Sequence, residues 1–320
     1  MNLRSFLKLV EIQTKIASVF PYLLGTAYVL YRYQDFDWLN GLIMFGAMLC
    51  FDMATTAINN YIDFQTAIKR EGYGYEEHNA MGRDGIAPKA ALRAIAILLI
   101  LAVAGGLLLF WRTQLNIVVL GLGMACFGMG VLYTFGPIPI SRTPLGEVLS
   151  GFTMGFIITF LAVYIHVYDS QLVLASYATG TLLLAFDLPE LCYLLLFALP
   201  AIVTIANIML TNNICDMEDD LANGRKTLPL VIGKKRALYL FGVLYALGYV
   251  SVLALVLLGI MPVYYLAGLL SAIVVYKNVK VFNQKHVKAE TFILAIRNFL
   301  AVNSLNLVLV CVALAFAGKA

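Results

Sequence analysis

Charged residues are scarce in this sequence. Asp, Glu, Lys and Arg make up only 12% of the 320 residues, whereas 62% are hydrophobic. A soluble globular domain carries about 25% charged residues, so the composition excludes an ordinary soluble protein. The mean hydropathy of +0.87 agrees with this. We therefore expect a polytopic membrane protein that contacts lipid, has no nucleic-acid partner and forms one transmembrane domain over residues 1–320.

Patterned cysteines and a leader segment are also lacking. The five cysteines lie in or beside apolar segments without metal-ligand spacing, which predicts small apolar residues in a reduced setting. No cleavable signal peptide is evident, because the first apolar stretch is too long and carries Glu11 and Lys15.

Long apolar runs make up most of the sequence. A helix needs about 20 mostly apolar residues to cross a bilayer. The runs predict an all-α transmembrane bundle of nine helices with a membrane-embedded cavity open to the cytoplasmic side. The predicted spans are 8–31, 40–66, 90–110, 115–136, 146–168, 191–214, 236–258, 261–280 and 291–317.

The basic residues predict the orientation. If the N-terminus is cytoplasmic, Arg32, Arg112 and Lys319 are the basic residues on the outer side. The rest of the 22 Lys and Arg residues fall on or near the cytoplasmic side. Cytoplasmic loops of membrane proteins carry this excess. We therefore expect a bacterial cell-membrane protein with a cytoplasmic N-terminus and an outer C-terminus.

A ladder of oxygen ligands follows the sixth span. Asn212, Asp216 and Asp220 recur every four residues, so a continued helix places them on one face. Their carboxylates repel each other, and the C-terminal end of a helix adds partial negative charge. Such a ladder requires a cation, and Mg²⁺ prefers one or two carboxylates together with substrate phosphates.

The pattern N-N-x-x-D occurs twice, at residues 59–63 and 212–216, and each copy ends an apolar span. The two copies open to the same side, as in a parallel internal repeat. Acids also mark where membrane helices meet water, but two matching copies weaken that alternative. The predicted catalytic and metal-binding residues are Asn59, Asp63, Asp216 and Asp220, with Asn60 and Asn212 beside them as substrate contacts.

Basic residues follow the second motif. Arg225 and Lys226 come directly after the acids, the order expected of a metal and diphosphate site. Arg142, in a proline-rich turn, is a further candidate for a phosphate, and Tyr133 for the cavity wall. The alternative is that these bases only signal topology.

Two charged residues lie deeper. Asp52 shares a helical stripe with Asp63 and lies about 16 Å further along the axis. A charge at the bilayer centre costs about 2.5–3.5 kcal/mol, so Asp52 should face a cavity or a partner. It is a candidate to accept a hydrogen bond from an aromatic acceptor, or else to join two helices. Lys15 is a candidate for the acceptor's carboxylate, for pairing with Glu11 or Asp52, or for reaching the interface.

These motifs are similar to those of the UbiA-type intramembrane aromatic prenyltransferases of quinone biosynthesis. The sequence most resembles their 1,4-dihydroxy-2-naphthoate polyprenyltransferases. The resemblance covers nearly the whole chain and includes both N-N-x-x-D copies and residues 132–137, 143–147 and 224–229. It implies Mg²⁺-dependent transfer of a polyprenyl group from a polyprenyl diphosphate to dihydroxynaphthoate, with loss of CO₂ and formation of demethylmenaquinone.

The first motif departs from the family pattern N-D-x-x-D-x-x-x-D. Asn60 replaces its first Asp and Ala67 its last, which leaves Asp63 as the one carboxylate. Glu71 or Asp84 would compensate from the glycine-containing loop 67–89, whose mixed charge suits either a lid or a solvated connector.

Other functions stay open at this point. Another quinone or haem branch would share the motifs, a secondary transporter would also contain repeats and buried acids, and a quinone-binding protein would share the apolar cavity. Mg²⁺-dependent product formation distinguishes an enzyme from a transporter or a binding protein.

Overall fold

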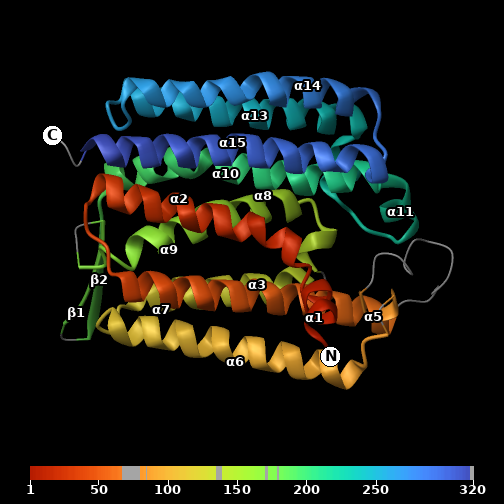
Figure 1. The fold of residues 1–320 in the computed structure, drawn as a ribbon, viewed down its shortest axis with the longest axis horizontal. Helices are drawn as coiled ribbons and strands as arrows, with labels where there is room; N and C mark the ends of the chain where they lie inside the picture. The colour runs from red at the N-terminus through yellow and green to blue at the C-terminus, as the bar shows by residue number, and fades with distance from the viewer. Residues whose placement is uncertain (67–79, 84, 135–138, 170–171, 179, 318–320) are drawn as a thin grey trace.

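The computed structural model describes residues 1–66, 80–83, 85–134, 139–169, 172–178 and 180–317. Long helices run side by side along the longest axis of the molecule (Figure 1). The helical elements are α1 (Leu3–Leu9), the 3₁₀ helix η1 (Ile12–Lys15), α2 (Ile16–Arg32), α3 (Trp38–Thr66), α5 (Ala80–Arg83), α6 (Pro88–Arg112), α7 (Ile117–Thr134), the 3₁₀ helix η2 (Ile140–Arg142), α8 (Gly146–Ser150), the π-helix η3 (Gly151–Ile157), α9 (Ile158–Tyr164), α10 (Leu188–Cys215), α11 (Met217–Ala222), α12 (Leu228–Ile232), α13 (Lys234–Leu257), the 3₁₀ helix η4 (Val263–Leu270), α14 (Ser271–Gln284) and α15 (Lys288–Ala317).

Seven helical segments in the described part of the chain are long and apolar enough to cross a membrane. They coincide with seven of the predicted spans. The span predicted at 115–136 contains a shorter apolar helix, Ile117–Tyr133. The span predicted at 8–31 is broken into α1, η1 and α2, because Glu11 adopts a left-handed backbone with φ of 47°.

The prediction of an all-helical chain is wrong in one place. Strands β1 (Val173–Ala178) and β2 (Thr181–Phe186) form an antiparallel hairpin in the predicted outer loop. Gly180 lies next to the turn with φ of 81°, a conformation that glycine adopts without a steric penalty. Both strands are rich in β-branched, aromatic and leucine side chains, which favour a strand, whereas the predicted spans 146–168 and 191–214 leave a loop in this region.

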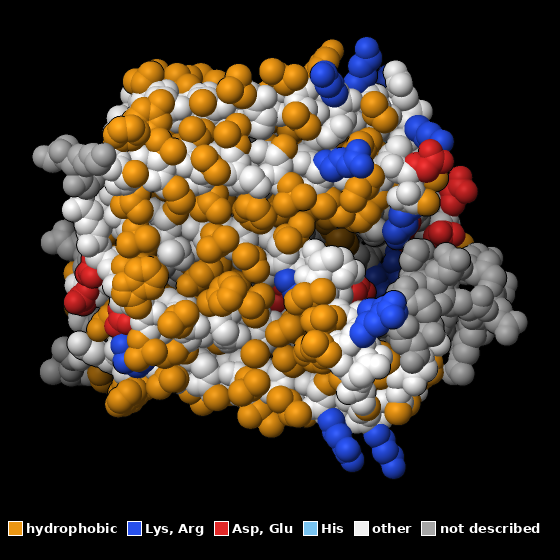
Figure 2. All heavy atoms as spheres, in the orientation of Figure 1, with side chains coloured by type: hydrophobic (Ala, Val, Ile, Leu, Met, Phe, Trp, Pro, Cys, Tyr) orange, Lys and Arg blue, Asp and Glu red, His pale blue; other side chains and the backbone are white. Residues whose placement is uncertain are grey.

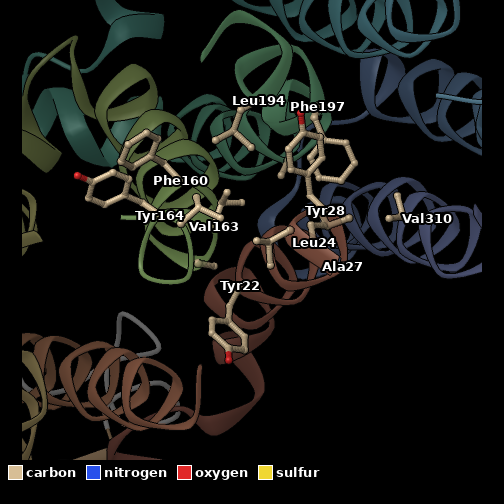
Figure 3. Close-up of a cluster of buried hydrophobic side chains, with 14 of the residues drawn as sticks. Tyr22, Leu24, Ala27, Tyr28, Phe160, Val163, Tyr164, Leu194, Phe197 and Val310 are labelled. Atoms are coloured by element: carbon tan, nitrogen blue, oxygen red, sulfur yellow. The ribbon is translucent and has the colours of Figure 1, made fainter. Parts of the chain in front are cut away.

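The main core lies between α2, α9 and α10 (Figure 3). Tyr28 of α2 packs on Phe197 of α10 with ring centroids 4.7 Å apart. At Gly25 a Cβ atom would lie 2.6 Å from the Thr159 carbonyl oxygen, so α2 and α9 approach at backbone distance. This central layer separates α13, α14 and α15 on one side from α3, α6 and α7 on the other (Figure 1).

Candidate active site

The two N-N-x-x-D copies lie at the same end of the molecule, where α1, α5 and α11 gather (Figure 1). Helix α10 ends at Cys215, and α11 begins at Met217. The backbone N–H of Asp216 still donates to the Asn212 carbonyl at 3.0 Å, and that of Asp220 to the Asp216 carbonyl at 2.8 Å. The predicted four-residue spacing therefore persists across the junction, although the helix is not continuous.

Both acids of the second motif are paired with bases. The Lys288 ammonium lies 2.5 Å from Asp216 Oδ2. The Arg225 guanidinium lies 3.1 Å from Asp220 Oδ1, and the Thr227 hydroxyl donates to Asp220 Oδ2 at 3.2 Å. Burial raises the pKa of Asp220 above its ordinary value, and Arg225 opposes that shift. The positive charges of Lys288 and Arg225 therefore compensate the negative charges of Asp216 and Asp220.

Lys288 was missed as a site residue by the sequence analysis, which counted it only among the basic residues on or near the cytoplasmic side. It is the first residue of α15 and lies 72 positions from Asp216. A basic residue at the end of a membrane helix has the same sequence signal in either role.

Three segments meet at the mouth of the site. The backbone N–H of Lys226 donates to the Arg142 carbonyl at 3.1 Å, which joins the loop after α11 to η2. Asp63, at the end of α3, is attracted by Arg225 and Arg142 and repelled by Glu11. Two of the predicted phosphate-binding bases, Arg225 and Arg142, thus lie within electrostatic reach of the metal ligand predicted in the first motif.

A cavity of about 880 Å³ extends inward from this mouth between α3, α6, α7 and the α8–α9 segment. Figure 2 shows the surface hollowed toward the right-hand end, next to basic and acidic side chains. Asn59 and Tyr133 lie on its wall, and the Tyr133 hydroxyl donates to Met209 Sδ at 3.3 Å. Six of the 11 methionines line it, a composition that accommodates varied apolar shapes.

The other predicted asparagines differ in their surroundings. Asn60 is buried, and its amide donates to the Leu9 carbonyl at 3.0 Å and to Glu11 Oε1 at 3.1 Å. It therefore holds the break between α1 and η1 and does not line the cavity. Asn212 is half-buried on α10, and its carbonyl receives the Asp216 N–H.

Glu147 is a buried carboxylate that sequence reasoning did not select. The Asn213 amide donates to Glu147 Oε1 at 2.8 Å, while Glu147 Oε2 is buried and has no hydrogen-bond partner among the described residues. The residue follows the proline-rich turn at the N-terminal end of α8, and the signal that pointed to it was its place in residues 143–147.

Lys15 and Asp52 form a buried ion pair at the cavity wall. The Lys15 ammonium is 2.6 Å from Asp52 Oδ1 and also donates to the Asp52 carbonyl and to the Thr56 hydroxyl. Ser18 donates to Asp52 Oδ2 at 2.6 Å. All three ammonium protons are engaged, so Lys15 is placed as a partner of Asp52 and not at the membrane interface. Asp52 itself lines the cavity.

The donor chemistry of the mouth fits a hard divalent cation. Asp63, Asp216, Asp220 and the Asn59 amide offer only oxygen ligands. In the part of the chain that the structure describes, no three His, Cys, Asp or Glu side chains are close enough to share an ion. The carboxylates of the second motif are instead held by bases, which a cation would displace. Two acids named above as compensating ligands, Glu71 and Asp84, lie outside the described residues, as do residues 67–79 of the predicted lid loop 67–89.

The model of the UbiA prenyltransferase family matches residues 18–305, a range that contains both motifs and the cavity wall from Ser18 onward. The chain belongs to this family. This UbiA-family protein is 32% identical over 248 residues to the 1,4-dihydroxy-2-naphthoate octaprenyltransferase of Bacillus subtilis, and the match covers 77% of this chain and 71% of that protein. The resemblance inferred from the motifs is confirmed.

Two solved UbiA homologues have the same fold. The apo homologue from Aeropyrum pernix K1 has a TM-score of 0.67 at 18% identity, covering 91% of this chain and 97% of that one. The homologue from Archaeoglobus fulgidus bound to GPP and Mg²⁺ has a TM-score of 0.63 at 14% identity, covering 97% and 99%. With its apolar helices and its family, the protein is an integral membrane prenyltransferase.

Proposed function

We propose that this UbiA-family protein transfers a polyprenyl group from a polyprenyl diphosphate to 1,4-dihydroxy-2-naphthoate. The proposal is carried by the placement of Asp63 within electrostatic reach of Arg225 and Arg142, next to a methionine-rich cavity that Asn59 lines. We infer the identity of the acceptor from similarity to the Bacillus subtilis enzyme, which is named for that substrate. Solved family members bound to GPP or DMAPP with Mg²⁺ support the donor class and the cation.

In the proposed reaction the carbon–oxygen bond of the allylic diphosphate breaks and a carbon–carbon bond to the aromatic ring forms. Diphosphate leaves, and the acceptor loses its carboxylate as CO₂, which gives the reduced form of demethylmenaquinone. Mg²⁺, when bound by Asp63, Asp216 and Asp220 with Asn59, neutralises charge on the leaving diphosphate.

The protein's own groups perform the remaining tasks. Arg225, Lys226 and Arg142 bind phosphate oxygens and stabilise their charge as the bond breaks. The apolar cavity keeps water from the allylic cation and holds the isoprenoid tail. Tyr133 lies on the wall of this cavity.

The proposed topology has nine spans in one domain over residues 1–320, with α2 and α7 added to the seven longer helices. We place the N-terminus in the cytoplasm and the C-terminus outside, in a bacterial cell membrane. The ion pairs at the hairpin end of the molecule support this orientation. Arg32 pairs there with Glu190, and Arg112 pairs with Asp37. These two arginines are neutralised, so they do not oppose an outer location of this end, whereas an excess of basic residues favours the cytoplasmic side.

The direct test is product analysis. Purified protein in detergent, given a polyprenyl diphosphate and dihydroxynaphthoate, is expected to form a prenylated naphthalenediol with release of CO₂ and diphosphate. Mass spectrometry identifies the product, and chelation of Mg²⁺ should stop its formation. Product from 4-hydroxybenzoate but not from dihydroxynaphthoate would move the protein to another branch of the family.

Lys226→Ala and Arg142→Ala are expected to raise the KM for the prenyl donor by about tenfold, because a hydrogen bond to a charged group is worth about 1.5–3 kcal/mol. A fall in kcat instead would mean that the contact strengthens as the bond breaks. Steady-state kinetics with varied donor measures both. Lys235→Ala, an exposed base on α13, is the matched control. Unchanged KM and kcat in both variants would mean that Lys226 and Arg142 do not bind the donor and serve only to set the topology.

Asp52→Asn is expected to raise the KM for the aromatic acceptor by about tenfold and leave Mg²⁺ and donor dependence unchanged, since Asp52 would accept a hydrogen bond from a ring hydroxyl. The variant leaves Lys15 buried without its counter-charge, which costs about 3–5 kcal/mol. The double variant Lys15→Gln, Asp52→Asn removes both charges and is the control for stability. Normal acceptor kinetics in the double variant would make Asp52 a structural residue.

A further inference from the structure

We propose that Glu11 supplies the carboxylate that the first N-N-x-x-D motif lacks, and that it acts with Asp63 on the divalent cation and the donor diphosphate. This inference rests on the function proposed above. Glu11 lies before residue 18, where the match to the family model begins. It is brought to the motif by the tertiary structure.

The position of Glu11 at the site is set by its neighbours. Its side chain lines the mouth of the cavity together with Asn59, and its charge acts on Asp63. Among the described residues on the cavity wall, Glu11 and Asp52 carry the carboxylates, and Asp52 is neutralised by Lys15 deep inside. Glu11 is therefore the wall carboxylate that lies at the metal-binding end.

Asn60 and Glu11 form a matched pair. The Asn60 side-chain amide has two protons, and these reach the Leu9 carbonyl at 3.0 Å and Glu11 Oε1 at 3.1 Å. An aspartate at position 60 would have no proton for either contact and would place two carboxylates side by side. A carboxylate at position 60 would therefore repel Glu11. In this chain Asn60 instead donates to the Glu11 carboxylate and holds it beside the motif.

The backbone holds Glu11 in place on both sides. Its φ of 47° and ψ of 60° turn the chain between α1 and η1, and the Thr14 hydroxyl donates to its carbonyl at 2.8 Å. Four residues further on, Lys15 fixes η1 to α3 through its ion pair with Asp52. A left-handed residue other than glycine, fixed in this way, is a feature that clusters at functional sites.

The test separates cation binding from turnover. Full-length protein in detergent is titrated with Mg²⁺ in the presence of inorganic diphosphate, and the rise in Tm gives the Mg²⁺ concentration for half of the maximal effect. Glu11→Gln keeps an oxygen for Asn60 and is expected to raise that concentration about tenfold or more. Glu218→Gln makes the same change on an exposed residue of α11 and should match the wild-type protein.

Glu11→Asp keeps a carboxylate at position 11 and is expected to recover most of the Mg²⁺ response that Glu11→Gln loses. The Tm without Mg²⁺ reports whether either variant folds less well. A Glu11→Gln titration that overlays that of Glu218→Gln would overturn the inference, and so would a Glu11→Asp variant that responds no better than Glu11→Gln. If the wild-type protein itself shows no Mg²⁺ response with diphosphate, the proposed function fails and not the role of Glu11 alone.

Discussion

Asp216→Asn and Asp220→Asn are each expected to reduce prenyl transfer by about a hundredfold or more, while the protein still inserts and folds. Each change removes one negative charge from the group that would hold the cation. Loss of a few kcal/mol of charge stabilisation at the leaving diphosphate lowers the rate tenfold for about every 1.4 kcal/mol. Initial rates at saturating Mg²⁺ and donor measure the effect.

The side chains explain why folding should survive. Asparagine can still accept the hydrogen bonds that Lys288 gives to Asp216 and that Thr227 gives to Asp220. The control is Asp219→Asn, since Asp219 is an exposed residue of the same short helix α11. We expect wild-type rates from it. Wild-type rates from Asp216→Asn or Asp220→Asn at saturating Mg²⁺ would remove the metal-site hypothesis.

Asp63→Ala is expected to be comparably severe, and Asn59→Ala milder. Asp63 is the one carboxylate of the first motif and lies within reach of Arg225 and Arg142. Its loss leaves that side of the site with Asn59, a neutral donor, and with Glu11. Rates measured against Mg²⁺ concentration should show both a lower maximum and a higher Mg²⁺ requirement in Asp63→Ala.

Gln65→Ala is the matched control for this second experiment, because Gln65 is exposed two residues further along the same helix end. An unchanged Mg²⁺ requirement in Asp63→Ala, with a normal rate, would transfer its role to other acids of the mouth. Glu11 is the first of these to examine by a double variant with Asp63.

Much of the fold could be predicted from the sequence because hydropathy is a local property. Each of the seven long apolar helices coincides with a predicted span. The two motifs were found for the same reason, since each lies within five consecutive residues at the end of an apolar run. The β-hairpin was missed because periodicity alone does not assign a short apolar run to a strand.

The partners of the charged residues could not be predicted from local sequence, because they lie far away along the chain. Glu11 meets Asn60 across 49 positions, Lys15 meets Asp52 across 37, and Lys288 meets Asp216 across 72. Sequence reasoning named Asp52 and Glu11 as possible partners of Lys15, but it sought the missing carboxylate of the first motif in loop 67–89. Helical periodicity fixes which face a residue occupies, but not which other helix that face meets.

The sequence by itself determined that this chain lies in a membrane, belongs to a family with two acid motifs and has bases beside the second one. These features depend on composition, on the spacing of neighbouring residues and on the loops in which they fall. Only the tertiary structure decided that Lys15 neutralises Asp52, that Asn60 presents Glu11, and that Lys288 and Arg225 hold the acids of the second motif. A buried or closely placed charge needs a counter-charge or a hydrogen bond, and the packing of α1, η1 and α15 against distant helix ends selects which group provides it.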